Sequence, residues 1–199
     1  MNNRKVHGGH AKLKAIVRAY VLRIRPRAQA EIDWFAHQPS LDAAIETAAL
    51  AVNSRGKRYS HQRRLKRAAL RQALHVLLDR SEEIERTREF DELFALIGAV
   101  AKPIPGIGEL YVYDTSLRIG AKLDLFPTGV YLHAGTRLGA RALELDDSAT
   151  KLKVSALPKE LRILEPHELE DVSCIFKDEL KTASAVPIMR DIVKRSWCT

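Results

Sequence analysis

The stretch KPIPGIG, residues 102–108, lies between two segments, 90–100 and 109–125, whose apolar residues recur at helical spacing. Two glycines around one apolar residue permit a tight turn, because glycine adopts backbone conformations that side chains disfavour. Ile107, between the two glycines, is expected to fill the apolar gap between the helices. The free N–H groups and the dipole at the start of the second helix should then face the same point as the glycine amides. The sequence therefore predicts a helical hairpin whose turn can bind an anion.

Helical patterns also precede this hairpin. Residues 11–25 carry apolar side chains at helical spacing as far as Pro26, which disfavours a helical conformation in the residue before it. Ser40 is the expected N-cap of a second helix, and Gly56 is the expected left-handed residue where that helix stops. A third amphipathic helix is expected over residues 65–78.

The carboxyl-terminal part also favours helices, which are expected to begin near Pro158 and Pro166. Only residues 130–133 and 151–154 are candidates for short strands. The predicted fold class is mainly α, in a single helical domain. Its expected parts are a basic N-terminal helix packed on the core, a helical core and a C-terminal helical extension, at residues 1–35, 36–145 and 146–199.

The distribution of charge indicates a polyanionic partner. The formal net charge of the 199-residue chain is +8, but residues 1–75 hold 16 Lys and Arg against 4 Asp and Glu, and residues 76–199 hold 17 against 21. The densest run, Arg55–Arg71, has eight basic residues and no acid. Clustered cations bind phosphates well because they release the condensed counterions. Nucleic acid, with double-stranded DNA first, is the expected partner; an anionic membrane surface or an acidic protein is the alternative.

Several classes of protein are excluded or disfavoured. No apolar stretch approaches the roughly 20 residues of a membrane-spanning helix, and no signal-peptide core follows the basic N-terminus. Cys174 and Cys198 are the only cysteines, which argues against a disulfide framework and a cysteine-rich zinc site. The histidines lack the HxxxH and HExxH spacings. We therefore expect a soluble cytoplasmic protein with no membrane association, no metal site and no cofactor.

The KPIPGIG turn and its flanking helices resemble the helix-hairpin-helix motif of DNA-binding and DNA-repair proteins over residues 90–123. This resemblance implies a helix-hairpin-helix core and sequence-independent contact with DNA phosphates. That family often has a polar or basic residue directly after the second glycine, whereas this chain has Glu109, an acid that repels phosphate. The alternative is an ordinary corner between two helices, in which the glycines only permit the turn.

Residues 113–119, with the sequence YDTSLRI, are similar to a Val-Asp-Thr-like segment of the helix-hairpin-helix base-excision DNA glycosylases. The resemblance implies that Asp114 is catalytic. It would either stabilise the positive charge that develops on the deoxyribose as a flipped base leaves, or orient a water. The spacing departs from that family, since its aspartate lies well beyond the hairpin and Asp114 follows Gly108 by six residues. The alternative is a surface ion pair between Asp114 and Arg118, four residues apart on one helix.

Two further segments carry groups suited to phosphate. Residues 56–64, GKRYSHQRR, combine cations, an aromatic ring and amide donors; their alternative is a solvated helix start. In residues 133–141, Thr136 would cap a helix and Arg137 would clamp an anion; the alternative is close helix packing through small residues, with His133 a hydrogen-bonded core histidine. The residues expected to contact DNA are Gly106, Ile107, Gly108, Lys57, Arg58, Tyr59, His61, Arg63, Arg64 and Arg137.

The leading hypothesis is a protein that binds the DNA backbone through the hairpin and the basic run. The first alternative is a small base-excision-type glycosylase that uses Asp114, and the second is a basic adaptor that docks an acidic protein. The leading hypothesis requires that the 102–108 turn and the cations of Arg55–Arg71 lie together in the folded chain.

Overall fold

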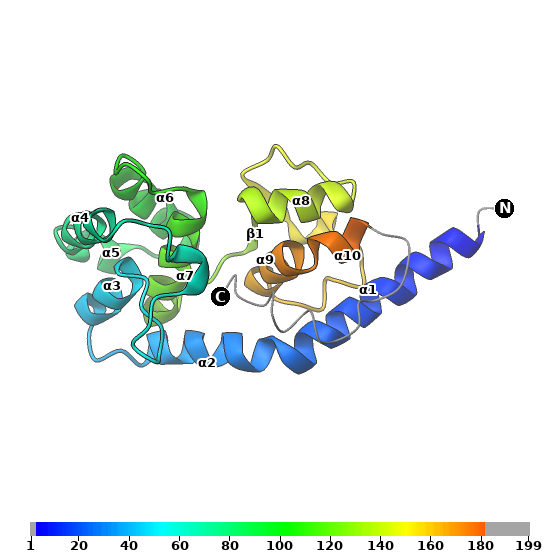
Figure 1. Ribbon diagram of the computed structural model, residues 1–199, viewed down its shortest axis with the longest axis horizontal. Helices are drawn as coiled ribbons and strands as arrows, with labels where there is room; N and C mark the ends of the chain where they lie inside the picture. Colours follow the sequence, from blue (N-terminus) through cyan, green and yellow to red (C-terminus); the bar gives the residue numbers. More distant parts are fainter. Residues whose placement is uncertain (1–2, 182–199) are drawn as a thin grey trace. The chain divides into compact units, whose positions relative to one another are not determined.

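The computed structural model describes residues 3–181, with side-chain exposure from Gly9 onward, and is mainly helical, as predicted (Figure 1). The described residues form ten α-helices and one two-stranded antiparallel sheet. The residues divide into two compact units. The hairpin unit is the continuous segment Ala28–Pro127, and the split unit combines the chain before it with the chain from Thr128 onward. The division is discontinuous in sequence, whereas the expected parts are consecutive.

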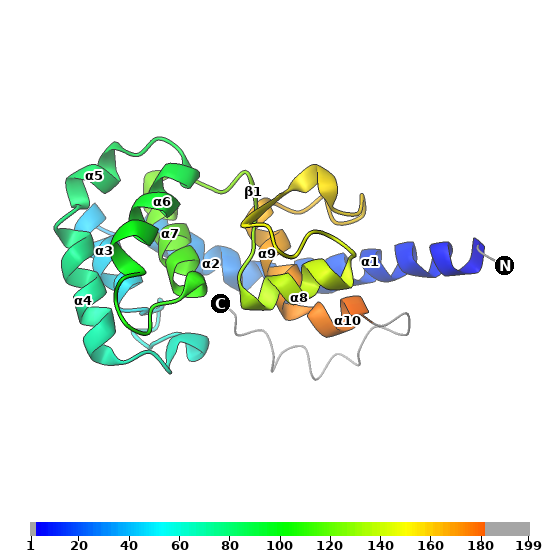
Figure 2. The ribbon, with the colours of Figure 1, turned by 90° about the horizontal axis from the view of Figure 1, so that it is seen from above.

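The hairpin unit contains the two helices on either side of the KPIPGIG turn. Its helices are α3 (Leu41–Ala49), α4 (Arg67–Leu78), α5 (Ser81–Arg86), α6 (Phe90–Ala101) and α7 (Glu109–Leu123). Helix α7 packs against both α3 and α6, and α4 packs against α3 and α6 (Figure 2). Their shared core is mainly aliphatic, with fully buried residues that include Ile45, Leu77, Leu93 and Ile97. Because α7 lies at the centre of this unit, most of its residues are buried.

Local signals in the sequence set several boundaries in this unit. Ser40 caps α3 as predicted, since its side chain accepts a hydrogen bond from Ala43 N at 3.1 Å. Gly56 takes the predicted left-handed conformation, with φ +67°. Helix α3 ends at Ala49, earlier than expected, because Ala51 has φ +56° and leaves the helical region. Helix α4 begins at Arg67 because residues 60–62 form a separate 3₁₀ turn before it.

The split unit is built around helix α9 (Pro166–Ile175). The other elements of this unit are α1 (Asn3–Arg23), β1 (Gly129–Tyr131), α8 (Ala134–Ala142), β2 (Lys151–Lys153) and α10 (Lys177–Lys181). The predicted strands pair antiparallel, with Val130 opposite Leu152. Helix α9 contacts α1, α8, α10 and β1, and every residue from Glu168 to Phe176 is buried. Pro166 begins α9 as predicted, whereas Pro158 begins only a turn, in which Leu161 N donates to Pro158 O at 3.0 Å.

Helix α9 carries buried acids that have specific partners within the split unit. Arg25, at the start of α2 (Arg25–Ala36), donates from Nε to Glu168 at 2.5 Å and from Nη2 at 2.7 Å. The Tyr20 hydroxyl donates to Asp171 at 3.0 Å. Burial, and then the nearby Asp171 carboxylate, raise the pKa of Tyr20 well above its ordinary value. These contacts join α1 and the start of α2 to a helix nearly 150 residues later in the chain.

The first helix stops before Pro26, as predicted, but helical structure resumes at once. Helix α1 stops at Arg23, and α2 begins at Arg25, so the proline occupies the first turn of α2. A first-turn N–H has no intrahelical partner, and a proline there removes no hydrogen bond.

Within residues 3–181, no helix is sufficiently long and apolar to cross a lipid bilayer. Residues 182–199, with Cys198 and the end of the predicted C-terminal extension, lie outside the described residues.

Candidate nucleic-acid interface

The turn between α6 and α7 has the compact geometry that the glycines predict. Ile104 N donates to Ala101 O and Ile107 N donates to Ile104 O, both at 3.0 Å. Ile107 is buried in the core of the hairpin unit, as predicted, together with Ile104. Gly106 has φ +93°, a backbone conformation that residues with a side chain rarely adopt. The two isoleucines therefore anchor the turn, and Gly106 and Gly108 stay on its exposed side.

At Gly108, unlike Gly106, the backbone conformation does not require glycine. Its φ is −117°, so the backbone is not strained, and a Cβ added at Gly108 would meet no atom within 4 Å. It is the N-cap of α7 but offers no side chain to accept a hydrogen bond from the first turn. Glycine is an acceptable N-cap, and its missing side chain also leaves the amides of the first turn open to close approach by an external group.

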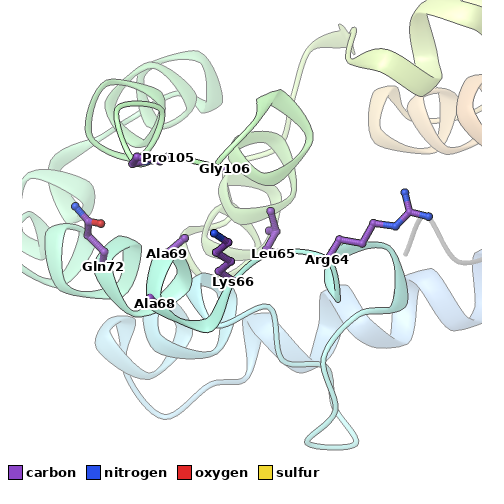
Figure 3. Close-up of a pocket in the computed structure, with 8 residues that line it drawn as sticks. All are labelled: Arg64, Leu65, Lys66, Ala68, Ala69, Gln72, Pro105 and Gly106. Atoms are coloured by element: carbon purple, nitrogen blue, oxygen red, sulfur yellow. The ribbon is translucent and has the colours of Figure 1, made fainter.

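The basic run lies beside this turn. A hollow of about 410 Å³ is lined on one side by Pro105 and Gly106, and on the other by residues between Arg64 and Gln72, which lead into α4 and form its first turns. Figure 3 shows the turn across from Ala69 and Lys66, with Gln72 toward one end and, at the other end, the Arg64 side chain extending away from the turn. The complete lining is Arg64, Leu65, Lys66, Ala68, Ala69, Gln72, Pro105 and Gly106. The predicted proximity of the glycine turn and the basic run is present in the hairpin unit.

Most of the basic run is exposed. Seven of its eight cations are exposed, and none of the seven forms an ion pair with an acid in the described part of the chain: Arg55, Lys57, Arg63, Arg64, Lys66, Arg67 and Arg71. Arg58 differs, because its Nη2 donates to Gln62 O at 2.5 Å and to Leu65 O at 2.8 Å. Arg58 therefore holds the backbone of the run in shape, whereas the other cations extend into solvent.

Asp114 lies on α7 and is only 8% exposed. Its Oδ2 accepts hydrogen bonds from Gln62 Nε2 at 2.8 Å and Arg118 Nη2 at 3.3 Å, and lies 2.7 Å from His61 Nε2. Arg118 also donates to Gln62 Oε1 at 3.0 Å. The predicted ion pair between Asp114 and Arg118 exists, but it is buried, because residues 59–62 fold over this face of α7. The network ties the basic run to the second helix of the hairpin.

Tyr59 belongs to the same buried group. Its hydroxyl donates to Glu31 at 2.9 Å, and the Arg118 guanidinium lies 3.9 Å from the centre of its ring. Burial raises the pKa of the Tyr59 phenol above its ordinary value, and the nearby Glu31 carboxylate adds to the increase. Stacking of Tyr59 on a nucleic-acid base would require this arrangement to open.

Arg137 lies in the split unit and is held by backbone carbonyls. Its Nη1 donates to Asp147 O and to Ala149 O, both at 2.8 Å. His133, rather than Thr136, is the N-cap of α8, and the Thr136 hydroxyl accepts from His133 N at 2.7 Å. His133 is buried and hydrogen-bonded to Glu170, as predicted for a core histidine. These contacts fit a structural function for Arg137.

Sequence reasoning does not find every residue of this arrangement. Gln72 lines the hollow but carries no pattern of its own, since its position depends on which segment folds against the turn. Lys66 and Gln62 lie in segments that the sequence does indicate, the basic run and residues 56–64, but their particular neighbours depend on the tertiary structure.

Comparisons with protein-family models, curated proteins and solved structures found no match to this chain. A function for this protein is therefore inferred from the geometry and charge of the site alone. The catalytic role that the glycosylase resemblance implies for Asp114 stays a prediction. Its contacts favour a positioning role, because its Oδ2 faces three neighbouring polar side chains.

Proposed function

We propose that the hairpin unit binds the phosphate backbone of double-stranded DNA, with α6, the 102–108 turn and α7 acting as a helix-hairpin-helix motif. The observation that carries the proposal is the hollow in which Arg64 and Lys66 share walls with Pro105 and Gly106. Each part alone is common in proteins. Their combination supplies amide donors and cations to one place, which is the chemistry that a phosphate diester requires.

The turn and the run contribute in different ways. Aligned peptide dipoles place about half a positive charge at the N-terminus of α7, and Gly108 leaves this end uncovered by a side chain. A phosphate oxygen at the turn accepts hydrogen bonds from the backbone. Lys66 and Arg64 neutralise the same phosphate or its neighbours, and Arg63 and Arg67, both exposed, extend the contact along the strand.

The buried network fixes these two parts relative to each other. Gln62 and His61 contact Asp114 on α7, and residues 63–66 follow directly in the chain. Arg58 adds a second restraint, because it binds the carbonyls of Gln62 and Leu65. The backbone that carries Arg63, Arg64 and Lys66 is thus held in place before a ligand arrives, which lowers the entropic cost of binding.

The test is the salt dependence of binding to a short DNA duplex. We expect affinity to fall steeply as salt rises, and the triple variant Arg63→Gln, Arg64→Gln, Lys66→Gln to bind roughly 10- to 100-fold more weakly at low salt. Each lost phosphate contact should reduce the slope of log affinity against log salt by about 0.9, so the triple variant should reduce it by up to about 3. Fluorescence anisotropy over a series of salt concentrations measures both quantities.

A second triple variant provides a control for net charge. Arg80→Gln, Arg86→Gln and Arg88→Gln remove the same charge from exposed positions in and next to α5, where Arg80 and Arg86 already pair with Glu83 and Glu82. This variant should keep most of the wild-type slope. Equal losses in both triple variants, or an affinity that does not respond to salt, would overturn the proposal. Tighter binding to an acidic protein than to the duplex would favour the adaptor hypothesis.

Substitution of Glu109 tests the proposal in the opposite direction, because it is expected to increase the affinity for DNA. It is exposed in the first turn of α7, one residue after Gly108, where its carboxylate repels a bound phosphate. Two unit charges about 4 Å apart in water repel by about 1 kcal/mol, so Glu109→Gln should tighten DNA binding roughly fivefold. The same change should lower the free energy of unfolding by about 0.3–1 kcal/mol, since an acid stabilises a helix N-terminus. Glu85→Gln, at an exposed position of α5, should change neither the DNA affinity nor the free energy of unfolding by a comparable amount.

A further inference from the structure

Three potential metal ligands of different chemistry meet inside the split unit. They are His133, at the N-cap of α8, and Glu170 and Cys174, four residues apart on one face of α9. One ligand atom from each lies within 4.8 Å of the other two, and all three residues are buried. His133 Nε2 is hydrogen-bonded to Glu170 Oε1. This cluster belongs to neither the hollow nor the Asp114 network of the hairpin unit.

The backbone is shaped to bring these groups together. A Cβ on Gly135 would lie 2.6 Å from the Cys174 sulfur, and a Cβ on Gly139 would lie 2.2 Å from Ser173 O. Real Cβ atoms do not approach other atoms so closely, so α8 can reach α9 only because both positions are glycine. The small-residue packing anticipated for residues 133–141 is confirmed at these two contacts. One result is that the imidazole, carboxylate and thiol face one another.

The donor set matches a borderline transition metal. Zn²⁺ takes thiolate at about 2.3 Å, imidazole at about 2.0–2.1 Å and carboxylate at about 2.0–2.2 Å. Tetrahedral coordination at those bond lengths separates ligand atoms by roughly 3.3–3.8 Å. The observed separations, within 4.8 Å, need only small side-chain movements to reach this range. In the metal-free protein the His133 imidazole is the hydrogen-bond partner of the Glu170 carboxylate, and a divalent ion would replace that contact with direct bonds to both side chains.

We propose that His133, Glu170 and Cys174 bind a single divalent transition-metal ion, of which Zn²⁺ is the model, with a fourth position left for water or another group. Coordination through Nε2 moves the imidazole proton to Nδ1, and the Cys174 thiol proton leaves to solvent. Metal binding gives up one contact, since a protonated Nδ1 cannot accept the hydrogen bond that Gly135 N donates to it at 3.3 Å. Metal binding therefore releases one proton, from the thiol, and is favoured as pH rises.

Cobalt reports on the site directly because a thiolate bound to Co²⁺ gives a near-ultraviolet charge-transfer band. The full chain, treated with a chelator and kept reduced, is titrated with Co²⁺ and then with Zn²⁺. We expect the band to saturate at one equivalent and to disappear when Zn²⁺ displaces Co²⁺. The melting temperature should rise as Zn²⁺ is added, since a ligand that binds only the folded state stabilises it.

Single variants assign the ligands. Cys174→Ser should abolish the band, and His133→Asn and Glu170→Gln should weaken metal binding by at least about 100-fold, since even outer-shell partners typically contribute 10–100-fold. Asparagine is a good N-cap, so His133→Asn preserves the start of α8, and circular dichroism verifies the fold of each variant. Cys198→Ser is the matched control and should keep the band. No thiolate band in the reduced wild-type protein, or a band that needs Cys198 and not Cys174, would overturn the site.

Discussion

Asp114→Ala is expected to lower the free energy of unfolding by about 3–5 kcal/mol, the usual cost of removing one partner from a buried ion pair. The substitution leaves the Arg118 guanidinium buried beside the Tyr59 ring with no carboxylate, and removes an acceptor from Gln62. Uncompensated charge is costly in this position because both side chains of the pair are about 10% exposed or less. Urea denaturation of the full chain, followed by circular dichroism, measures the change.

Two further variants test whether the lost stability comes from the buried Asp114 contacts. Asp114→Asn keeps an oxygen of similar shape and should lose less stability than the alanine variant, because an acceptor remains for Gln62. Glu85→Ala removes an exposed acid from the same unit and should stay within about 0.5 kcal/mol of wild type. If Asp114→Ala lowered the free energy of unfolding as little as Glu85→Ala, the network would not hold the basic run against α7.

Gly139→Ala is expected to destabilise the split unit by about 3 kcal/mol, at the upper end of the usual cost of overpacking. The added Cβ would stand 2.2 Å from Ser173 O, and a backbone oxygen of a buried helix cannot move aside as a flexible side chain can. The two helices would have to separate, which would also pull apart the cluster of His133, Glu170 and Cys174. Thermal or urea unfolding of the full chain measures the loss.

A second glycine in a helix makes the matched comparison. Gly9 lies in α1, where an added Cβ would meet no atom within 4 Å. Gly9→Ala should raise the free energy of unfolding by about 0.5–1 kcal/mol, because alanine has the higher helix propensity. The same chemical change is thus expected to act with opposite signs at two helical positions. A stabilising effect at Gly139 would mean that α8 and α9 do not pack as closely as described.

The sequence predicts well what depends on neighbouring residues. The α6–α7 hairpin, the Ser40 cap and the left-handed Gly56 all follow from local patterns. The two short strands, 129–131 and 151–153, overlap the segments expected as strands, although their antiparallel pairing was not predicted. In each case the signal comes from residues adjacent in the chain, and it is read from spacing, caps and glycine alone.

Prediction is poorer where distant segments meet. The Asp114–Arg118 pair has the spacing of a surface pair, and only the fold of residues 59–62 over α7 makes it buried. The expected segment 1–35 is continuous, yet α2 crosses the boundary between the units. Metal-ligand spacing likewise gave no sign of the cluster in the split unit, because His133 is 37 residues from Glu170.

The order of the two units along the chain has a consequence for synthesis on the ribosome. The Tyr20 hydroxyl bonds to Asp171, 151 residues later, and Ile16 shares a core with Phe176. Translation at about 5–20 residues per second leaves α1 without its packing partners for roughly 8–30 seconds. The hairpin unit ends at Pro127, before Asp171 is synthesised, so it can fold while the apolar stripe of α1 is still uncovered. We therefore expect chaperones that act on nascent chains to bind α1.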